Sequence, residues 1–509
     1  MLTVKTMNKN VIIFGRHPVG ESLVSQFKAD GAVVSRQEQF LVPDILPDEM
    51  AILSSSPSGD SDAEAFLSDL AVAFKESAQN RPVVHLLLRK PTSLRKYQVS
   101  DFEPIVNEVF EVFPFTMEEV WAENVIVRLP GIDSHNPPAL DREPITAESH
   151  QFVHLVIAGF DSYAESIAVK AAQVAHFPNY DGKAKHPFRT RITIIAPGIK
   201  ASKDSFIARY HTLFDNSFYR SIDLDNRKSV LHHPIYEGKR EDFVDVEWEF
   251  VDGSLSNPII IKKLSLWAKD SGRQMTLVIS GSDDNANVDN ALALPDALLE
   301  SETPIWVRTH KDIISKTLGQ SPRYSHIIAF GMDNCGYSVH LPIMQMAKLL
   351  HYFYSCSYGV KGIPTSFPQE EVDVEWRKAG PLKMRLSNVC NVLTMSTKMH
   401  SLGHNADDVH TFYALTEEEI QSLSRTEHNR WSVERLLSGT RPCTDEERSA
   451  IKKDIKLKKQ FKAKDIHYDL CAYDELGVDE KGIDVRTYDY ALTACIPLIV
   501  ESFLKEGAK

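Results

Sequence analysis

Four residues of one predicted helix form the set with the clearest chemical use, namely Glu427, His428, Trp431 and Arg435. At about 100° per residue, Glu427 and Trp431 fall on the apolar stripe of the helix, with His428 and Arg435 along its margin. A carboxylate on a packing face is costly unless it meets a partner such as Arg435, or a ligand. An aromatic face beside a few charges can hold a small planar anion. Two interpretations stay open: a ligand site, or a solvated helix edge with pairs four residues apart.

The sequence marks both ends of the helix that carries these residues. Thr416 and Glu419, three residues apart, form a capping box at its start. Gly439 is a C-terminal stop signal. These signals predict a helix of about six turns, with Ile420 and Leu423 on its apolar stripe.

The beginning of the chain resembles the strand, turn and helix that bind a nucleotide phosphate. VIIFG reads as a buried strand, and the turn runs from Gly15 to Gly20. His17 stands where a dinucleotide fingerprint has its middle glycine, so the motif is incomplete. The candidate cofactor contacts are Gly15, Arg16, Gly20 and Arg36. Arg36 follows the second strand, and an exposed arginine without a ligand is the alternative there.

A second βαβ beginning follows near residue 151 and indicates an internal duplication. Its turn reads Gly159-x-Asp161-x-x-Ala164 in place of three spaced glycines. Asp161 would repel a pyrophosphate unless a cation intervened. Gly159 and Asp161 are the cofactor candidates here, and the polar loop at 280–290 lies where doubly wound sheets bind ligands.

The order of strand-like and helix-like segments predicts an α/β plus α fold. We expect two Rossmann-like doubly wound parallel-sheet domains at residues 1–135 and 151–335. A Pro-rich polar stretch at 136–150 is the predicted linker between them. From residue 336 to 509 the alternation stops, which predicts a mainly helical region with a bundle-like core.

Composition restricts the partners and the compartment. The 509-residue chain has a formal net charge of −13, so a nucleic-acid or anionic-membrane partner is not expected. The basic run at 448–464 contains one aromatic residue and is typical of a solvated helix face. No apolar run is long enough to span a membrane, and the start lacks the apolar stretch of a signal peptide. Six scattered cysteines without a C-x-x-C pair favour a cytoplasmic protein with reduced thiols.

Familiar catalytic and metal-binding motifs are absent from the sequence. It contains no G-x-S-x-G nucleophile elbow, no P-loop and no H-E-x-x-H. The acids Asp283, Asp284 and Asp289 do not have the spacing of an EF-hand. We therefore expect no metal site and name no catalytic residue.

The C-terminal part resembles the ryanodine-receptor (RyR) repeat domain. The likeness rests on Glu427-x-x-x-Trp431 with His428 and Gly439, on HYDLCAYDEL at 467–476, and on Asp484. Bacterial proteins with RyR-like domains behind TrkA-type nucleotide-binding Rossmann domains have a similar order, and residues 347–354 and 387–388 resemble their connecting region. The resemblance places an RyR-like domain at about 410–509, and implies regulation by a nucleotide-like small molecule in bacterial signalling or defence.

These observations favour a cytosolic, non-enzymatic sensor that binds a nucleotide-like small molecule. Its C-terminal ligand residues would be Glu427, His428, Trp431, Arg435, His467 and Tyr468. The cofactor is undetermined, with a nucleotide or NAD(P) as candidates, and homo-oligomers are compatible with the sequence. The alternatives are an NAD(P)-dependent oxidoreductase using Gly15, Gly20 and Gly159, and a structural protein that oligomerises and binds nothing.

Overall fold

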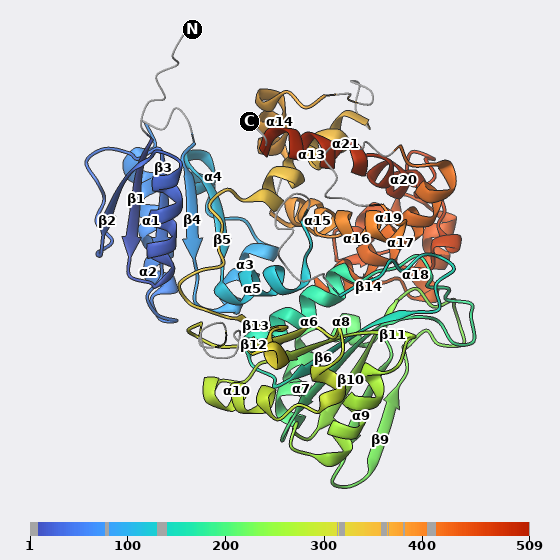
Figure 1. Cartoon of the computed structure of the whole chain (residues 1–509). Helices are drawn as coiled ribbons and strands as arrows, with labels where there is room; N and C mark the ends of the chain where they lie inside the picture. Colours follow the sequence, from blue (N-terminus) through green and yellow to red (C-terminus); the bar gives the residue numbers. More distant parts are fainter. Residues whose placement is uncertain are drawn as a thin grey trace.

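The protein is a mixed α/β molecule with two parallel-sheet parts and a set of helices (Figure 1). The computed structural model describes residues 9–76, 81–129, 140–312, 314, 321–357, 364, 366–379, 382–404 and 414–507. The prediction of an α/β fold with parallel sheets and additional helices is confirmed.

The first sheet has five parallel strands in the order β2-β1-β3-β4-β5. Its strands are β1 (Asn10–Gly15), β2 (Val33–Gln37), β3 (Glu49–Leu53), β4 (Val83–Leu87) and β5 (Glu111–Phe115). Five helices alternate with them, α1 (Val19–Ala29), α2 (Asp60–Phe74), α3 (Pro91–Val99), α4 (Pro104–Val109) and α5 (Met117–Ile126). Since β1 lies between β2 and β3, the direction of winding reverses next to β1, where open α/β sheets bind ligands.

The second sheet has eight strands in the order β13-β12-β11-β6-β7-β10-β8-β9. They are β6 (Phe152–Ala158), β7 (Thr190–Ala196), β8 (Tyr219–Asp223), β9 (Lys228–His232), β10 (Val246–Asp252), β11 (Arg273–Ile279), β12 (Ile305–Arg308) and β13 (Ile327–Phe330). Only the β8–β9 pair is antiparallel among the pairs of this sheet that the structure describes. Without that hairpin, the order around β6 reads 3-2-1-4-5-6, and winding reverses between β6 and β11.

Helices flank the second sheet and supply its core. They are α6 (Ser162–Val174), α7 (Lys200–Arg209), α8 (His211–Phe214), α9 (Pro258–Ala268), α10 (Asp284–Leu292) and α11 (Asp296–Leu299), with the 3-10 helix η1 (Pro322–Tyr324). Alanines fill the buried face of α6, which lets this helix pack closely on α5. The contact between α5 and α6 joins the two α/β parts.

The C-terminal part is helical, as expected from the loss of strand signals. Its helices are α13 (Pro342–Ser357), α14 (Gln369–Lys378), α15 (Leu382–Val392), α16 (Met395–Ser401), α17 (Glu417–Leu437), α18 (Asp445–Lys453), α19 (Leu457–Lys462), α20 (Arg486–Ala494), α21 (Ile496–Gly507) and the 3-10 helix η2 (Tyr473–Glu475). In the described part of this region, strands are limited to the pair β14 (Arg441–Pro442) and β15 (Ile466–His467). The basic run at 448–464 covers parts of α18 and α19.

Helix α17 begins and ends where the sequence predicts. The Thr416 N–H donates to a Glu419 carboxylate oxygen at 2.7 Å, and the Glu419 N–H donates to Thr416 Oγ1 at 3.3 Å. Gly439 follows the last turn with φ of +89°, a conformation that favours glycine. The capping box and the stop signal are both confirmed.

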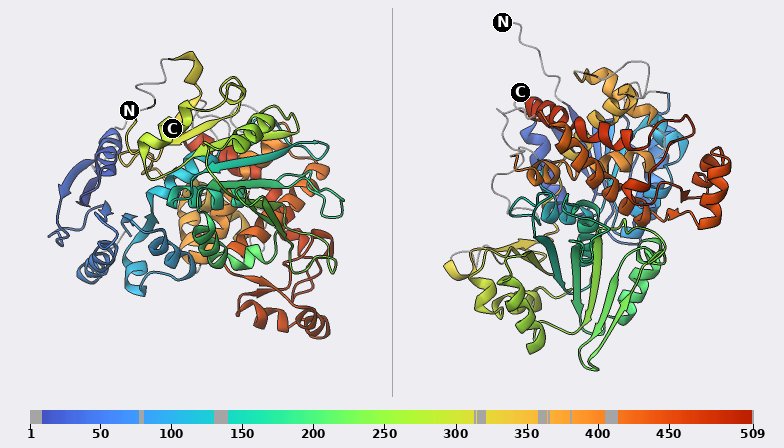
Figure 2. Two further views of the ribbon diagram at one scale, coloured as in Figure 1. Left: turned by 90° about the horizontal axis from the view of Figure 1, so that it is seen from below. Right: turned by 90° about the vertical axis from the view of Figure 1, so that its right-hand side faces the viewer.

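The segment after β13 returns to the first sheet and ties the parts together. Tyr337 stacks on Phe115 at 3.7 Å between ring centroids, and its hydroxyl lies 2.7 Å from His85 Nδ1. Gln26 donates through its side-chain amide to the Tyr337 carbonyl at 2.8 Å. The second sheet lies below both the first sheet and the helical part in Figure 1 and in the right-hand view of Figure 2.

The predicted linker packs against the protein where it is described. Residues 136–139 lie outside the described residues. Leu140 and Ile145 are buried in the same core cluster as β6, and Asp141 bonds His400 at 2.8 Å. This stretch therefore contributes to the contact between the second sheet and the helical part.

No helix in the described ranges is long and apolar enough to cross a membrane.

Candidate functional site

The carboxylate of Glu427 is buried in the protein and forms ion pairs with two cations. Arg430 donates to it through Nε and Nη2, both at 2.9 Å, and Lys398 Nζ lies 2.5 Å from Oε2. Burial alone would raise the pKa of Glu427, but Arg430 and Lys398 outweigh it and lower the pKa to about 2. The prediction that Arg435 pairs with Glu427 is wrong, because the guanidinium of Arg430 binds this carboxylate instead.

His428 also points inward, at the contact of α17 with α20 and with the segment before α20. Its Nε2 lies 2.8 Å from the Cys471 carbonyl, and its Nδ1 lies 3.4 Å from Asp489 Oδ2. Burial favours the neutral ring, but the bond to Asp489 outweighs it and raises the pKa of His428. Both ring nitrogens therefore have partners within the protein.

The remaining residues of the predicted site lie nearer the surface. The Arg435 guanidinium lies 5.7 Å from the Trp431 ring centroid, and His467 meets the same ring edge-on at 4.9 Å. Burial, together with Lys462 and Arg435, holds the pKa of His467 well below its usual value. The structure thus brings Trp431, Arg435 and His467 together.

Tyr468 belongs to a neighbouring cluster. Arg448 and Lys458 lie over its ring at 4.9 and 5.4 Å, and the ring packs with Cys443 and Ile466. It is therefore not grouped with Trp431.

The two predicted arginines, one in the turn after β1 and one on β2, are paired within the chain. Arg16 contacts Glu38, and Arg36 contacts Glu21. Gly15 has φ of +85°, and a Cβ there would lie 2.2 Å from the Leu53 carbonyl oxygen. The close passage of β3 is therefore sufficient to require glycine at position 15.

The side chains near Gly20 and His17 occupy the rest of this turn. A Cβ on Gly20 would lie 3.1 Å from Arg36 Nη2. His17 Nδ1 accepts the Val19 N–H at 3.2 Å, and its Nε2 contacts Arg89. Burial and the adjacent Arg89 lower the pKa of His17 to about 4, so the ring is neutral at pH 7.

In the turn after β6, Asp161 is held by side chains from neighbouring strands. Asp161 caps α6 by accepting the Ala164 N–H at 2.9 Å, and it accepts Ser280 Oγ–H at 2.8 Å. Arg308, at the end of β12, donates to its other oxygen at 2.5 Å. A cation therefore does lie beside Asp161, namely the guanidinium of Arg308, which the sequence alone did not identify. A Cβ on Gly159 would lie 1.8 Å from the Ser280 carbonyl oxygen, so backbone packing also requires this glycine.

The acids of the loop after β11 have structural partners. Asp283 caps α10 by accepting the N–H groups of Asn285 and Ala286. Asp284 accepts the His310 N–H at 2.8 Å and lies 2.8 Å from its Nδ1. Within the described ranges, no group of three or more His, Cys, Asp or Glu side chains could hold a metal ion.

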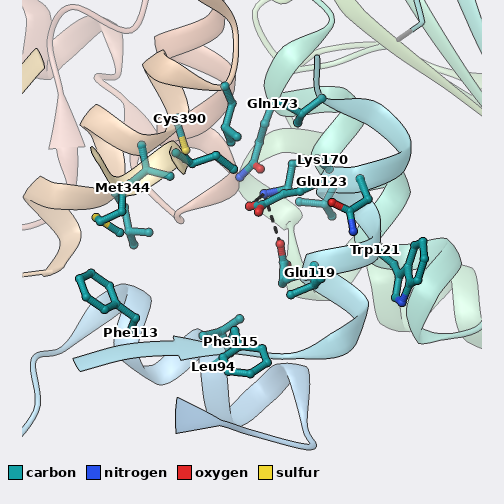
Figure 3. Close-up of a pocket in the computed structure, with 18 of the residues that line it drawn as sticks. Leu94, Phe113, Phe115, Glu119, Trp121, Glu123, Lys170, Gln173, Met344 and Cys390 are labelled. Atoms are coloured by element: carbon teal, nitrogen blue, oxygen red, sulfur yellow. Dashed lines mark hydrogen bonds and ion pairs between the residues drawn. The ribbon is translucent and has the colours of Figure 1, made fainter. Parts of the chain in front are cut away.

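A cavity of about 750 Å³ lies where both α/β parts meet the helical part (Figure 3). Its walls come from β5 of the first sheet, from β12 and β13 of the second, from α3, α5, α6, α13, α14, α15 and α17, and from the segment after β13. The aromatic residues of the lining are Tyr97, Phe113, Phe115, Trp121, Tyr210, Trp306, Tyr337 and Trp376. Its volume and largely apolar wall with a few polar groups are typical of a small-molecule site.

Lys170 of α6 supplies a buried charge to the cavity wall. Its ammonium lies 2.9 Å from Glu123 and 3.3 Å from Glu119, both on α5, as Figure 3 shows. Burial disfavours the charged form, but the two carboxylates outweigh it and raise the pKa of Lys170. Lys170 is therefore charged, and its ammonium is already paired with the two glutamates of α5.

Arg435 is the residue that connects the predicted site with this cavity. It lines the cavity and also lies over Trp431. Glu427, His428, Trp431, His467 and Tyr468 are not among the lining residues. Sequence reasoning missed the cavity because its walls come from segments hundreds of residues apart.

Neither a protein-family model nor a curated protein matches this chain. The likeness to RyR repeat and TrkA-type domains rests on the residues quoted for it.

Proposed function

We propose that this protein is a non-enzymatic regulatory sensor that binds a nucleotide-like small molecule in the central cavity. The observation that supports it is the cavity of about 750 Å³, whose lining comes from both sheets and from the helical part. A molecule bound there would contact all three parts at once. Its binding free energy would therefore favour one mutual arrangement of them, as a sensor requires.

The proposal includes the finer architecture expected from the sequence. The two sheets are Rossmann-like domains, the helices at about 410–509 form an RyR-like domain, and the protein acts in the cytoplasm. The strand order 3-2-1-4-5-6 around β6 supports the Rossmann-like assignment of the second sheet. In this proposal Arg435 is a ligand contact, and Glu427 and His428 hold α17 in place.

The contacts at the turn after β6 argue against the oxidoreductase alternative. A dinucleotide would place its pyrophosphate at the N-terminus of α6. That end is capped by the Asp161 carboxylate, which is bonded to Ser280 and Arg308. The Asp161 carboxylate thus occupies the helix end that a pyrophosphate would need, and a dinucleotide would have to break its bonds to Ser280 and Arg308.

Calorimetry with nucleosides and nucleotides tests the assignment. Val389 of α15 lines the cavity, so Val389→Trp should fill part of it and abolish binding of any compound that the unmodified protein binds. Val374 on α14 is exposed and does not line the cavity, so Val374→Trp is the matched control. Thermal unfolding establishes that both variants fold. Equal affinity in Val389→Trp and the control would overturn the cavity assignment.

A further inference from the structure

The cavity wall contains buried hydrogen-bond donors that have no acceptor. Among the described lining residues, three side chains have a buried nitrogen without a hydrogen-bond partner: Nε of Arg385, Nε of Arg435 and Nε1 of Trp376. All three are N–H donors. Among the described lining residues, no buried side-chain acceptor atom is without a hydrogen-bond partner. Such donors normally find a partner in a folded protein, so their concentration on one cavity needs a physical reason.

Two of these donors lie side by side. Arg385 Nη2 donates to the Trp376 carbonyl at 3.4 Å, and the guanidinium lies 5.2 Å from the Trp376 ring centroid. Trp376 is 2% exposed, so solvent does not satisfy its indole N–H. Burial lowers the pKa of Arg385, although a guanidinium stays charged at neutral pH. Arg385 and Trp376 therefore present one positive charge and two free N–H groups.

The third donor comes from α17 and contacts the same helix as Arg385. Arg435 Nη2 lies 3.4 Å from Ser387 Oγ, two residues after Arg385 on α15. Its Nε lies 3.9 Å from Glu434, beyond hydrogen-bond distance. Arg430 occupies that carboxylate at 2.8 Å.

The other acids of the wall are also engaged. Glu119 and Glu123 both pair with Lys170. The wall thus supplies partners for its own lysine, whereas the Nε groups of Arg385 and Arg435 and the indole N–H of Trp376 have no acceptor. Glu111 and Asp101 act on the charge of Arg385 from outside the lining. A bound acceptor with negative charge would match these donors, because charge-assisted hydrogen bonds to arginine are stronger than neutral ones.

We infer that the ligand of this cavity carries an acidic group, a carboxylate or a phosphate, bound by Arg385 and Trp376 with Arg435 as a further donor. The inference rests on the proposed function, because it names the chemical class of the molecule in the same cavity. The aromatic walls take the planar part of the ligand, and the donor group fixes the end that carries the acid.

The test compares AMP, adenosine and adenosine-5′-carboxylate by calorimetry on the full chain. AMP and the carboxylate should each bind at least about tenfold more tightly than adenosine. Arg385→Gln should weaken both acids about tenfold or more and leave adenosine within about twofold. Trp376→Phe keeps the ring, removes one donor and should weaken the acids by a smaller factor.

Arg448→Gln is the matched control for the loss of a buried guanidinium. Arg448 also has a buried Nε without a partner, but it lies over Tyr468 and does not line the cavity. Arg448→Gln should leave the affinities for all three compounds unchanged.

The outcomes separate the inference from the proposed function. If adenosine binds as tightly as the acids, or if Arg385→Gln weakens adenosine as much as it weakens the acids, the inference is overturned and the proposed function stands. If none of the three compounds nor any other nucleotide binds, the proposed function fails and the inference fails with it. Tighter binding of AMP than of the carboxylate would identify the group as phosphate.

Discussion

The turn after β6 and the wall of the central cavity use their polar groups in opposite ways. Asp161 in the turn is bonded to Ser280 and Arg308, so its charge is matched within the chain. Arg385 and Trp376 in the cavity wall keep buried N–H groups without an acceptor among the described residues. We call a group of charges whose partners all lie within the chain a closed network; it stabilises the fold, because breaking it leaves a charge unpaired. We call a buried N–H group without an acceptor an open donor; it contributes little to the fold and remains available to a ligand.

The same contrast appears within α17. Glu427 belongs to a closed network with Arg430 and Lys398, whereas Arg435, two turns later, lines the cavity. One helix therefore carries both a stabilising ion cluster and a candidate ligand contact. Substitutions in the Glu427 ion cluster should therefore change stability, and substitutions at the unpartnered donors of the cavity wall should change ligand binding.

Glu427→Gln should cause the largest loss of stability. It keeps the volume of the side chain but leaves Lys398 and Arg430 buried without that carboxylate, which costs about 3–5 kcal/mol of the free energy of unfolding. Urea unfolding measures it. Glu418→Gln, in the exposed first turn of the same helix, is the control and should cost below about 1 kcal/mol. A loss below about 1 kcal/mol for Glu427→Gln would show that the network is not closed as described.

The pH dependence of stability offers a second measure of the same network. The pKa of Glu427 is lowered from 4.5 to about 2, so its contribution is present above pH 4.5 and is lost as pH falls towards 2. Between pH 5.5 and pH 3 this residue alone should remove about 2 kcal/mol of unfolding free energy. Urea unfolding at pH 5.5 and pH 3 measures this decrease in the free energy of unfolding. The decrease should be smaller in Glu427→Gln than in the unmodified protein by about 2 kcal/mol. Equal decreases in the two proteins would contradict the assigned pKa.

The parts of the fold that depend on neighbouring residues could be predicted from the sequence. The capping box of Thr416 and Glu419 and the stop at Gly439 act within one turn, so they specified α17 correctly. Runs such as VIIFG specified buried parallel strands for the same reason. The prediction of a carboxylate in the apolar seam was sound, since Glu427 is fully buried.

The partners of these groups could not be predicted, because they depend on chain topology. Lys398 reaches Glu427 across 29 positions, and Arg308 reaches Asp161 across 147. Arg430 lies three residues after Glu427, a spacing at which helical side chains pair, so this partner could be predicted from the sequence, whereas Arg435 was named instead. The cavity depends on packing among three parts, and no local pattern indicates it.

Asp161→Asn should have an intermediate effect on stability and none on ligand affinity. The amide keeps an acceptor for Ala164 and Ser280, but it removes the charge that faces Arg308, which costs about 1–2 kcal/mol. The control is Asp252→Asn, at the end of β10, where the carboxylate accepts the Gly198 N–H at 2.7 Å. Urea unfolding and AMP titration measure both properties. Tighter AMP binding in Asp161→Asn would move the ligand site to this turn, because the neutral amide opposes a phosphate less than the carboxylate does.

Arg36→Ala should have the smallest effect and separates the first turn from the cavity as a ligand site. Arg36 pairs with Glu21 at the surface, and exposed ion pairs contribute about 0.2–1 kcal/mol, so unfolding in urea should change little. If the guanidinium contacted a phosphate, its removal would weaken AMP about tenfold or more, since charge-assisted bonds are strong. We expect AMP affinity within about twofold of the unmodified protein, because the side chain is matched by Glu21 and does not line the cavity. Glu21→Gln is the paired variant: it frees Arg36, and tighter AMP binding in that variant alone would show that the turn binds phosphate once its ion pair is broken.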